Sequence, residues 1–305
     1  MEKRAKPRDK RFWSQAVSVL AINAWLPNWL TGRIFQGNIK GVCVPVLNCY
    51  SCPSALGACP VGAMQTMMGG LRFNLSVAEK KFGLYVAGLM GISGSIAGRW
   101  TCGWLCPFGF LQELMYKIHT PKIDLPKFLS YARYVFLALM VVILPVLIVD
   151  QFGYGQTWFC KWVCPAGTLE AGIPLVLLNK GLRGLVGFMY YWKVAVLFLF
   201  LGLMTVSRRP FCRAVCPLGA FLGLFNKVSF FRMVVDDEKC IHCGTCRKDC
   251  PVGHRIDTAP NSPDCIRCLR CVSKCKYGAV SYDFLGRSSK PAESLRGAGG
   301  TLQTP

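Results

Sequence analysis

Residues 240–251 read CIHCGTCRKDCP, and residues 265–275 read CIRCLRCVSKC. Both stretches have the spacing C-x2-C-x2-C-x3-C, and the first continues into Pro251. Two-residue spacers let three thiolates converge on one face of an iron–sulfur cube, so this spacing is typical of 4Fe-4S ligands. Zinc is the competing interpretation, but zinc sites usually pair two C-x2-C knuckles across a longer loop. The doubled pattern therefore predicts two 4Fe-4S clusters.

The two runs also predict how the ligands are shared. In two-cluster proteins of this kind, the fourth cysteine of each run crosses to the other cluster. Residues 236–283 are therefore expected to form an α+β domain of the bacterial two-cluster ferredoxin type. The expected ligand sets are Cys240, Cys243, Cys246 and Cys275 for one cluster, and Cys265, Cys268, Cys271 and Cys250 for the other.

The composition of the rest of the chain predicts a membrane protein. The 305 residues are 52% hydrophobic and 17% charged, and they include 18 cysteines. The formal charge of +21 would suit nucleic acid or an acidic membrane surface. Iron–sulfur clusters held by thiolates are negatively charged and offset part of this excess. The remaining basic residues crowd the ends of apolar segments, so membrane lipid is the expected partner and nucleic acid is not.

Four apolar segments are close to the roughly 20 residues that a bilayer core requires. The expected fold is an α-helical membrane protein with about four transmembrane helices in residues 1–235, then the ferredoxin domain, then a disordered tail at 284–305. Basic residues flanking the segments predict that both termini and the ferredoxin domain face the cytoplasm, in a multi-pass protein of the inner membrane. The predicted spans are Phe12–Leu30, Phe82–Gly98, Tyr131–Val149 and Val186–Val206.

One phrase, C-x3-C-P, follows each of the last three predicted spans and continues into a glycine two residues past the proline. It places cysteines at 102 and 106, at 160 and 164, and at 212 and 216, and Cys59-Pro60 is a looser copy. Such an internal repeat is hard to attribute to chance. By the predicted topology one membrane-side cluster is expected on the cytoplasmic side, with the ligands Cys102, Cys106, Cys212 and Cys216.

Six further cysteines fall on the opposite side of the predicted membrane, which is more than one cluster needs. They are Cys43, Cys49, Cys52, Cys59, Cys160 and Cys164. One cluster with two spare cysteines is the simplest interpretation. A redox disulfide, a more elaborate site and an ordinary disulfide network in an oxidising compartment stay open as alternatives. One or two further 4Fe-4S clusters are thus expected in the membrane domain.

Three charged residues near these cysteines have two interpretations each. Glu113 and Glu170 follow C-P phrases and could pass protons to a quinone, and helix capping or solvation explains them equally well. Lys193 lies within a predicted span, where an ionisable residue is a functional hypothesis by default. It lies about two turns into that span, and snorkelling of its ammonium group to the interface is the alternative.

The combination of C-x3-C-P phrases with a terminal double cluster resembles the NapH/NosR/CcoG group of polyferredoxin-type membrane proteins, over roughly residues 80–283. The resemblance implies electron transfer between cytoplasmic donors or the quinone pool and a second redox partner in or outside the membrane. It leaves open two alternatives, a metal-reducing assembly factor for a metalloenzyme and a non-catalytic membrane anchor subunit of a reductase.

Overall fold

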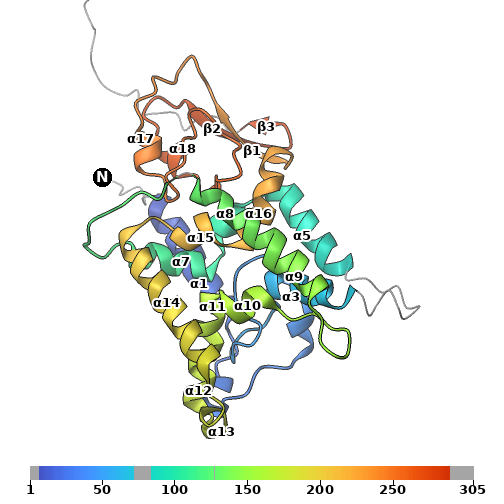
Figure 1. Cartoon of the computed structure of the whole chain (residues 1–305). Coiled ribbons are helices and arrows are strands. Elements are labelled where there is room, and N and C mark those ends of the chain that lie inside the picture. Colours follow the sequence, from blue (N-terminus) through green and yellow to red (C-terminus); the bar gives the residue numbers. More distant parts are fainter. Residues whose placement is uncertain (1–6, 72–83, 127, 289–305) are drawn as a thin grey trace, which may run out of the picture.

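The helical part of the chain consists of two successive series of helices in the same order (Figure 1). The computed structural model describes residues 7–71, 84–126 and 128–288. The first series comprises α1 (Pro7–Ile22), α2 (Asn28–Thr31), η1 (Asn38–Gly41), α3 (Pro60–Gly69), α5 (Leu84–Ala97), α6 (Trp100–Trp104) and α7 (Pro107–Met115).

The second series follows the same general order and adds short helices at 158–162 and 180–183 that the first series lacks among the described residues. It comprises α8 (Leu129–Val135), η2 (Phe136–Ile143), α9 (Leu144–Leu147), α10 (Trp158–Trp162), α11 (Pro165–Gly167), η3 (Thr168–Gly172), α12 (Ile173–Leu178), α13 (Lys180–Arg183), α14 (Phe188–Val206), α15 (Pro210–Ala214), α16 (Pro217–Leu224) and η4 (Phe225–Lys227).

The cysteine–proline pairs at 59, 106, 164 and 216 each start a helix, whereas those at 52 and 250 do not. The cysteine is the N-cap residue with an extended backbone, and the proline takes the first helical position, where its fixed φ fits and no N–H is needed. The backbone N–H of the glycine two residues past the proline then donates to the cysteine sulfur, at 3.4 Å for Cys106 and Cys216 and 3.5 Å for Cys164. The phrase therefore fixes each sulfur at a helix N-terminus.

Two helices among the described residues are long and apolar enough to cross a membrane, namely Leu129–Leu147 (α8, η2 and α9) and Phe188–Val206 (α14). The first begins two residues before the third predicted span and ends two residues before its end, and the second falls within the fourth predicted span. The second predicted span begins outside the described residues and continues as α5, a helix of 14 residues. Four transmembrane helices were expected, and the described residues contain two helices that could span a membrane.

The first predicted span, Phe12–Leu30, is not one helix. Helix α1 ends at Ile22, and the amide of Asn23 donates to the Val19 carbonyl and to Asn48. The buried side of α1 is polar: Arg11 and Ser18 donate to the carbonyls of Gly103 and Leu105 at the end of α6. This helix therefore satisfies the C-terminus of α6 instead of presenting an apolar surface all round.

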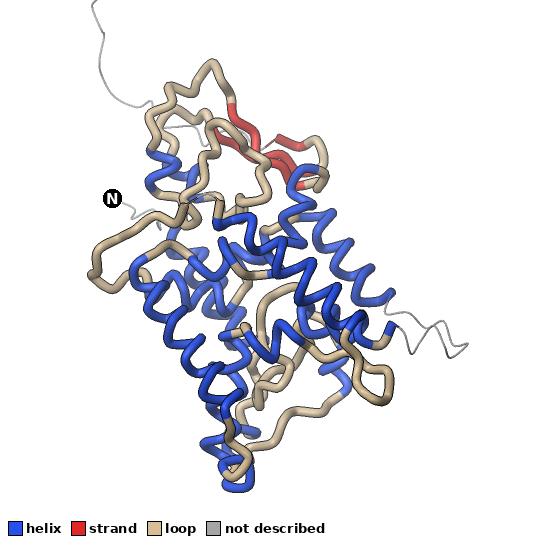
Figure 2. Tube along the Cα trace, in the orientation of Figure 1, coloured by secondary structure: helices blue, strands red, loops and turns tan. Residues whose placement is uncertain are grey.

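The C-terminal unit, residues 231–288, carries the only sheet of the described residues (Figure 2). Strand β1 (Phe231–Val235) pairs antiparallel with β2 (Val280–Phe284), which pairs with β3 (Arg287–Ser288). Helices α17 (Thr245–Lys248) and α18 (Arg270–Lys274) lie between the strands in sequence and contact each other. The sheet thus begins five residues before the boundary expected at 236, and residues 284–288, expected in the tail, belong to it. Residues 289–305 lie outside the described residues.

Candidate iron–sulfur sites

The eight cysteines of the C-terminal unit gather around two hollows. The first hollow is open to solvent and is lined by Cys240, Cys243, Cys246 and Cys275. The second is lined by Cys250, Cys265, Cys268 and Cys271, and Cys246 lines both hollows. The fourth cysteine of each run thus reaches the hollow of the other run. We call these groups the first and the second C-terminal sets.

The second set shows how four thiols converge. Burial raises the pKa of Cys271 well above its usual value, and the thiols of Cys268, Cys265 and Cys250 raise it further. The backbone N–H groups of Arg267 and His254 donate to the sulfurs of Cys265 and Cys250, each at 3.4 Å. These sulfurs thus share one space and receive N–H groups from the loops around them.

A third group, the proximal site, consists of Cys102, Cys106, Cys212 and Cys216. All four cysteines are buried. Burial raises the pKa of Cys216 well above its usual value, and the neighbouring thiols of Cys212, Cys102 and Cys106 raise it further. The site joins the phrase after α5 to the phrase after α14, about 110 residues later in the chain. The structure therefore brings together the four cysteines expected on the cytoplasmic side.

A fourth group, the distal site, contains four of the six cysteines expected on the opposite side. Burial is the largest cause of the raised pKa of Cys164, and the thiols of Cys160, Cys49 and Cys59 raise this pKa further. Figure 1 places the helices that follow these cysteines, α3 and α11, farther from the C-terminal unit than α7 and α15. Cys52 is next to this group, since its backbone N–H donates to the Cys49 carbonyl at 3.1 Å.

Two buried arginines bracket the proximal site in a reciprocal way. Arg99 lies three residues before Cys102 and donates to the Cys212 carbonyl at 3.2 Å. Arg209 lies three residues before Cys212 and donates to the Cys102 carbonyl at 2.8 Å. Each arginine is 1% exposed and therefore places a positive charge in the interior next to these cysteines. Gln112, also buried, donates from its amide to the Cys212 sulfur at 2.9 Å.

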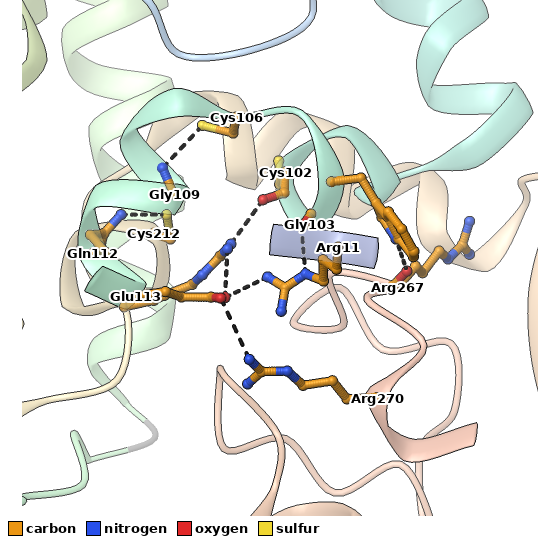
Figure 3. Close-up of polar contacts among 12 residues, drawn as sticks. Arg11, Cys102, Gly103, Cys106, Gly109, Gln112, Glu113, Cys212, Arg267 and Arg270 are labelled. Atoms are coloured by element: carbon orange, nitrogen blue, oxygen red, sulfur yellow. Dashed lines mark hydrogen bonds and ion pairs between the residues drawn. The ribbon is translucent and has the colours of Figure 1, made fainter. Parts of the chain in front are cut away.

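Glu113 neutralises part of this buried charge (Figure 3). Its carboxylate pairs with Arg209 at 2.7 Å, with Arg270 at 3.7 Å, and with Arg11. Burial opposes ionisation, but Arg209, Arg11 and Arg270 together lower the pKa of Glu113 to about 2. Glu113 is therefore an ionised hub that joins α1, α7, α18 and the residue before α15. It is not a free proton donor toward a quinone.

Glu170 and Lys193 occupy the distal site. The Glu170 carboxylate accepts the backbone N–H of Cys49 at 2.5 Å, and burial raises its pKa to about 7. Burial raises the pKa of the Cys160 thiol, and the nearby ammonium group of Lys193 opposes this increase. A Cβ added to Gly167 would lie 3.9 Å from Lys193 Nζ and 3.6 Å from the Cys49 sulfur. Lys193 therefore points at these cysteines from α14.

The second C-terminal set is held against the proximal site by polar contacts. Trp104 donates to the Arg267 carbonyl at 3.1 Å, and Asn226 donates to the Cys265 carbonyl at 2.8 Å (Figure 3 shows Arg267). Arg133 pairs with Asp264 at 2.7 Å. These contacts, each from the helical part to the run 264–267, fix the orientation of the C-terminal unit.

The backbones of the helical part and the C-terminal unit approach each other closely beside the cysteines of these two groups. A Cβ added to Gly103, next to Cys102, would lie 2.4 Å from the Ile266 carbonyl, next to Cys265. Only glycine leaves room for this approach. Arg209 is acted on by Cys212, Cys106 and also Cys268, so its charge lies between the proximal site and the second C-terminal set.

The residues present fit iron–sulfur clusters. All 18 cysteines are free thiols, and burial raises the pKa of Cys106 to about 12 and that of Cys265 to about 12. Bare thiolates would be costly there, but iron, buried arginines and N–H donors compensate thiolate charge. In residues 7–71, 84–126 and 128–288, no three His, Cys, Asp or Glu side chains converge closely enough for a single metal ion. In the C-terminal unit the cysteines line hollows instead of converging on one point.

Several site residues were missed by reading the sequence. Arg99 and Arg209 repeat as R-x2-C-x3-C-P-x-G, and this longer phrase was available at 99–109 and 209–219. Gln65 and Gln112 each lie six residues after the cysteine of a C-P pair, which is a second signal. The hub at Glu113 had no signal, because its arginines come from distant parts of the chain.

Comparison with protein families agrees with the repeat. A model described as a 4Fe-4S binding domain matches residues 57–78, 82–126 and 133–178, so each match contains one C-P phrase. A model described as a 4Fe-4S dicluster domain matches residues 210–254, which include Cys212, Cys216 and the first cysteine run. The matches to 4Fe-4S family models thus extend beyond the C-terminal unit into the helical part.

Related proteins are found in archaea and bacteria. An uncharacterized protein of Methanocaldococcus jannaschii is 35% identical over 199 residues, 62% of this chain and 74% of the relative. The putative electron transport protein YccM of Escherichia coli is 26% identical over 208 residues, 64% of this chain and 54% of that protein. The ferredoxin-type protein NapH of Haemophilus influenzae is 25% identical over 185 residues, 57% and 58% of the two chains.

Proteins named NosR and MauN are also similar to this chain. No solved structure matches it. The predicted resemblance to the NapH and NosR proteins is therefore confirmed, and it begins upstream of residue 80, at the match to residues 57–78. The chain belongs to the polyferredoxin-type iron–sulfur electron transport proteins that bind 4Fe-4S clusters.

Proposed function

We propose that this chain is a membrane-bound relay that carries electrons between a soluble partner at the C-terminal unit and a second redox partner beyond the distal site. The 4Fe-4S clusters supply one-electron oxidation and reduction when bound. The observation that carries the proposal is the linear order of four cysteine groups. The first C-terminal set leads to the second, then to the proximal site, then to the distal site.

The contacts between neighbouring groups support this order. Cys246 lines both hollows of the C-terminal unit. Gly103 brings the backbone beside Cys102 against the backbone beside Cys265. Leu47, two residues before Cys49, lies in the same buried core cluster as Cys106. Neighbouring groups are thus joined through packed residues of the chain.

The two long apolar helices support a location in the membrane. Only 17% of the apolar window of each helix is buried within the protein, although the mean hydropathy is 2.0 for Leu129–Leu147 and 1.7 for Phe188–Val206. A core helix of a soluble protein would be mostly buried. Exposed apolar side chains such as Phe188 (74%) and Phe198 (64%) suit lipid contact instead. The inner membrane, with the C-terminal unit in the cytoplasm, is the location we propose.

The soluble partner is expected to dock at the first C-terminal set. Cys243 is exposed, and the hollow it lines opens to solvent, whereas the second set faces the helical part. Electron transfer falls off with distance, so a partner has to reach the most exposed cluster. Lys239, Lys274 and Lys276 also line this hollow and would favour a partner with acidic residues around its own redox group.

The test uses the full chain, purified without oxygen and inserted into vesicles with the C-terminal unit outside. A reduced soluble ferredoxin is added, and cluster reduction is followed by visible absorbance and EPR. The wild-type chain should show reduction of the distal signal, and Cys102→Ser/Cys106→Ser should stop reduction at the C-terminal unit. Distal reduction that persists without the proximal site would contradict the relay.

A further inference from the structure

The two helical series are related as two copies of one structural unit. Helix α1 contacts α6 and α7, and its counterpart α8 contacts α15 and α16. Helix α3 contacts α5, and its counterpart α11 contacts α14. In both copies the chain passes a C-P phrase, then a long helix, then an R-x2-C-x3-C-P-x-G phrase. The same order in both copies is the pattern of an internal duplication.

This duplication makes the distal site the counterpart of the proximal site. The proximal site takes one phrase from each copy, Cys102/Cys106 from the first and Cys212/Cys216 from the second. The distal site likewise takes Cys59 from the first copy and Cys160/Cys164 from the second. In both sites, burial and three neighbouring thiols raise the pKa of the cysteine that starts a helix of the second copy, Cys164 or Cys216.

The one irregular position has a structural replacement. Four residues before Cys59, where the phrase would carry its first cysteine, the chain has Ala55, which is fully buried. Cys49 supplies the missing thiol from the preceding loop. It acts on both Cys59 and Cys164. The distal site therefore reaches four thiols by a different route from the proximal site.

A glutamine occupies the same place in both sites. Gln65 and Gln112 lie six residues after Cys59 and Cys106, and each is fully buried. Gln112 donates to the Cys212 sulfur at 2.9 Å, and Gln65 donates to the Cys160 sulfur at 3.1 Å. The oxygen of Gln65 accepts the Phe159 N–H at 2.8 Å, which fixes its NH2 group toward the sulfur.

The two remaining cysteines have other environments. Burial alone raises the pKa of Cys43 to about 11. The backbone of Cys43 forms an isolated parallel β-bridge with the backbone of Ala58. The Cys52 sulfur lies 3.3 Å from the Ser54 hydroxyl and 3.7 Å from the Asn23 side-chain oxygen, to which its S–H donates. The polar partners of the Cys52 sulfur are therefore Ser54 and Asn23, and neither belongs to the distal site.

We propose that Cys49, Cys59, Cys160 and Cys164 hold a 4Fe-4S cluster equivalent to the proximal one, with Gln65 as its hydrogen-bond donor, and that Cys43 and Cys52 are not ligands. The inference deepens the proposed function, because this cluster would be the end of the relay. It needs four thiolates, which lose their protons when the irons bind.

The experiment compares two pairs of cysteine variants in the full chain, purified without oxygen. Iron and acid-labile sulfide are measured per chain. Cys59→Ser and Cys164→Ser should each lose one 4Fe-4S equivalent, whereas Cys43→Ser and Cys52→Ser should keep the wild-type content. Equal losses in the second pair, or unchanged content in the first, would overturn the ligand set.

A milder pair of variants protects the test against misfolding. Gln65→Leu should keep all iron but lower the reduction potential of a single EPR-detected cluster, because an N–H donor to sulfur is lost. Gln112→Leu should do the same for a different cluster. A common signal shifted by both variants would refute two separate sites. If the distal cluster binds but is not reduced from the C-terminal unit, the relay fails and the site stands.

Discussion

The proximal and distal sites are both built from C-P phrases at helix N-termini, but the charged residues around them differ. At the proximal site, Arg99 and Arg209 lie three residues before their cysteines and are fully buried. At the distal site the equivalent position before Cys160 is Thr157, and Lys193 and the carboxylate of Glu170 are present instead. Fixed positive charge favours the more reduced, more negative cluster. We therefore expect the proximal cluster to have the higher reduction potential.

The same difference has consequences for stability. The proximal arginines need a counter-charge and they also hold the C-terminal unit, since Arg99 donates to the Pro263 carbonyl at 2.8 Å. The distal site has no comparable contact with another unit among the described residues. Of the two copies of the duplicated site, the proximal one thus contacts the C-terminal unit, whereas the distal one is isolated from it.

Removing the proximal counter-charge should have the largest effect. In Glu113→Gln, the guanidinium groups of Arg11 and Arg209 stay buried without an anion, which should cost about 3–5 kcal/mol of unfolding free energy. The midpoint of thermal unfolding in detergent measures this. Glu238→Gln, at an exposed carboxylate, is the control. Equal midpoints for the two variants would show that the hub does not stabilise the fold.

Removing one arginine of the proximal site should bring the reduction potential of the proximal cluster closer to that of the distal cluster, or below it. At a separation of about 4–8 Å and an effective dielectric constant of about 20, one charge contributes about 2–4 kcal/mol between redox states. Arg99→Gln should lower the potential of the proximal cluster only, and Arg99→Lys should restore most of it. EPR-monitored redox titration distinguishes these results. A potential that Arg99→Gln leaves unchanged would refute the charge argument.

The glycine of the C-P-x-G phrase should be essential at one site and replaceable at the other. A Cβ on Gly219 would lie 2.7 Å from the buried Arg99 guanidinium, whereas a Cβ on Gly62 meets nothing within 4 Å. Gly219→Ala should cost about 1–3 kcal/mol. Gly62→Ala should be neutral or slightly stabilising, because alanine favours the helix. Thermal unfolding compares the two, and a larger loss for Gly62→Ala would contradict the structure.

The smallest effect is expected from Glu170→Leu, which gives the distal site the residue that the proximal site has at the equivalent position, Leu222. Loss of the carboxylate should raise the potential of the distal cluster and leave the proximal one unchanged. Leu222→Met is the matched control. Redox titration at a fixed pH checks both variants, and a shift of the proximal signal alone would exchange the two assignments.

The sequence by itself predicts the kind of ligand and the crossed pairing of the two cysteine runs, and it shows the repeated C-P phrases, because each depends on spacing within a few residues. It also located the two long apolar helices. The extent of residues 12–30 was misjudged, since apolar composition does not show that Arg11 and Ser18 bond to the end of another helix.

Only the tertiary structure decided which four of six distal cysteines converge, and which charges surround each site. Cys49 meets Cys164, and Arg209 meets Cys102, across more than 100 residues of sequence. Such pairs depend on how the two copies of the repeat pack against each other, and local spacing carries no information about that packing. The same repeated phrase therefore gave two sites whose charges differ.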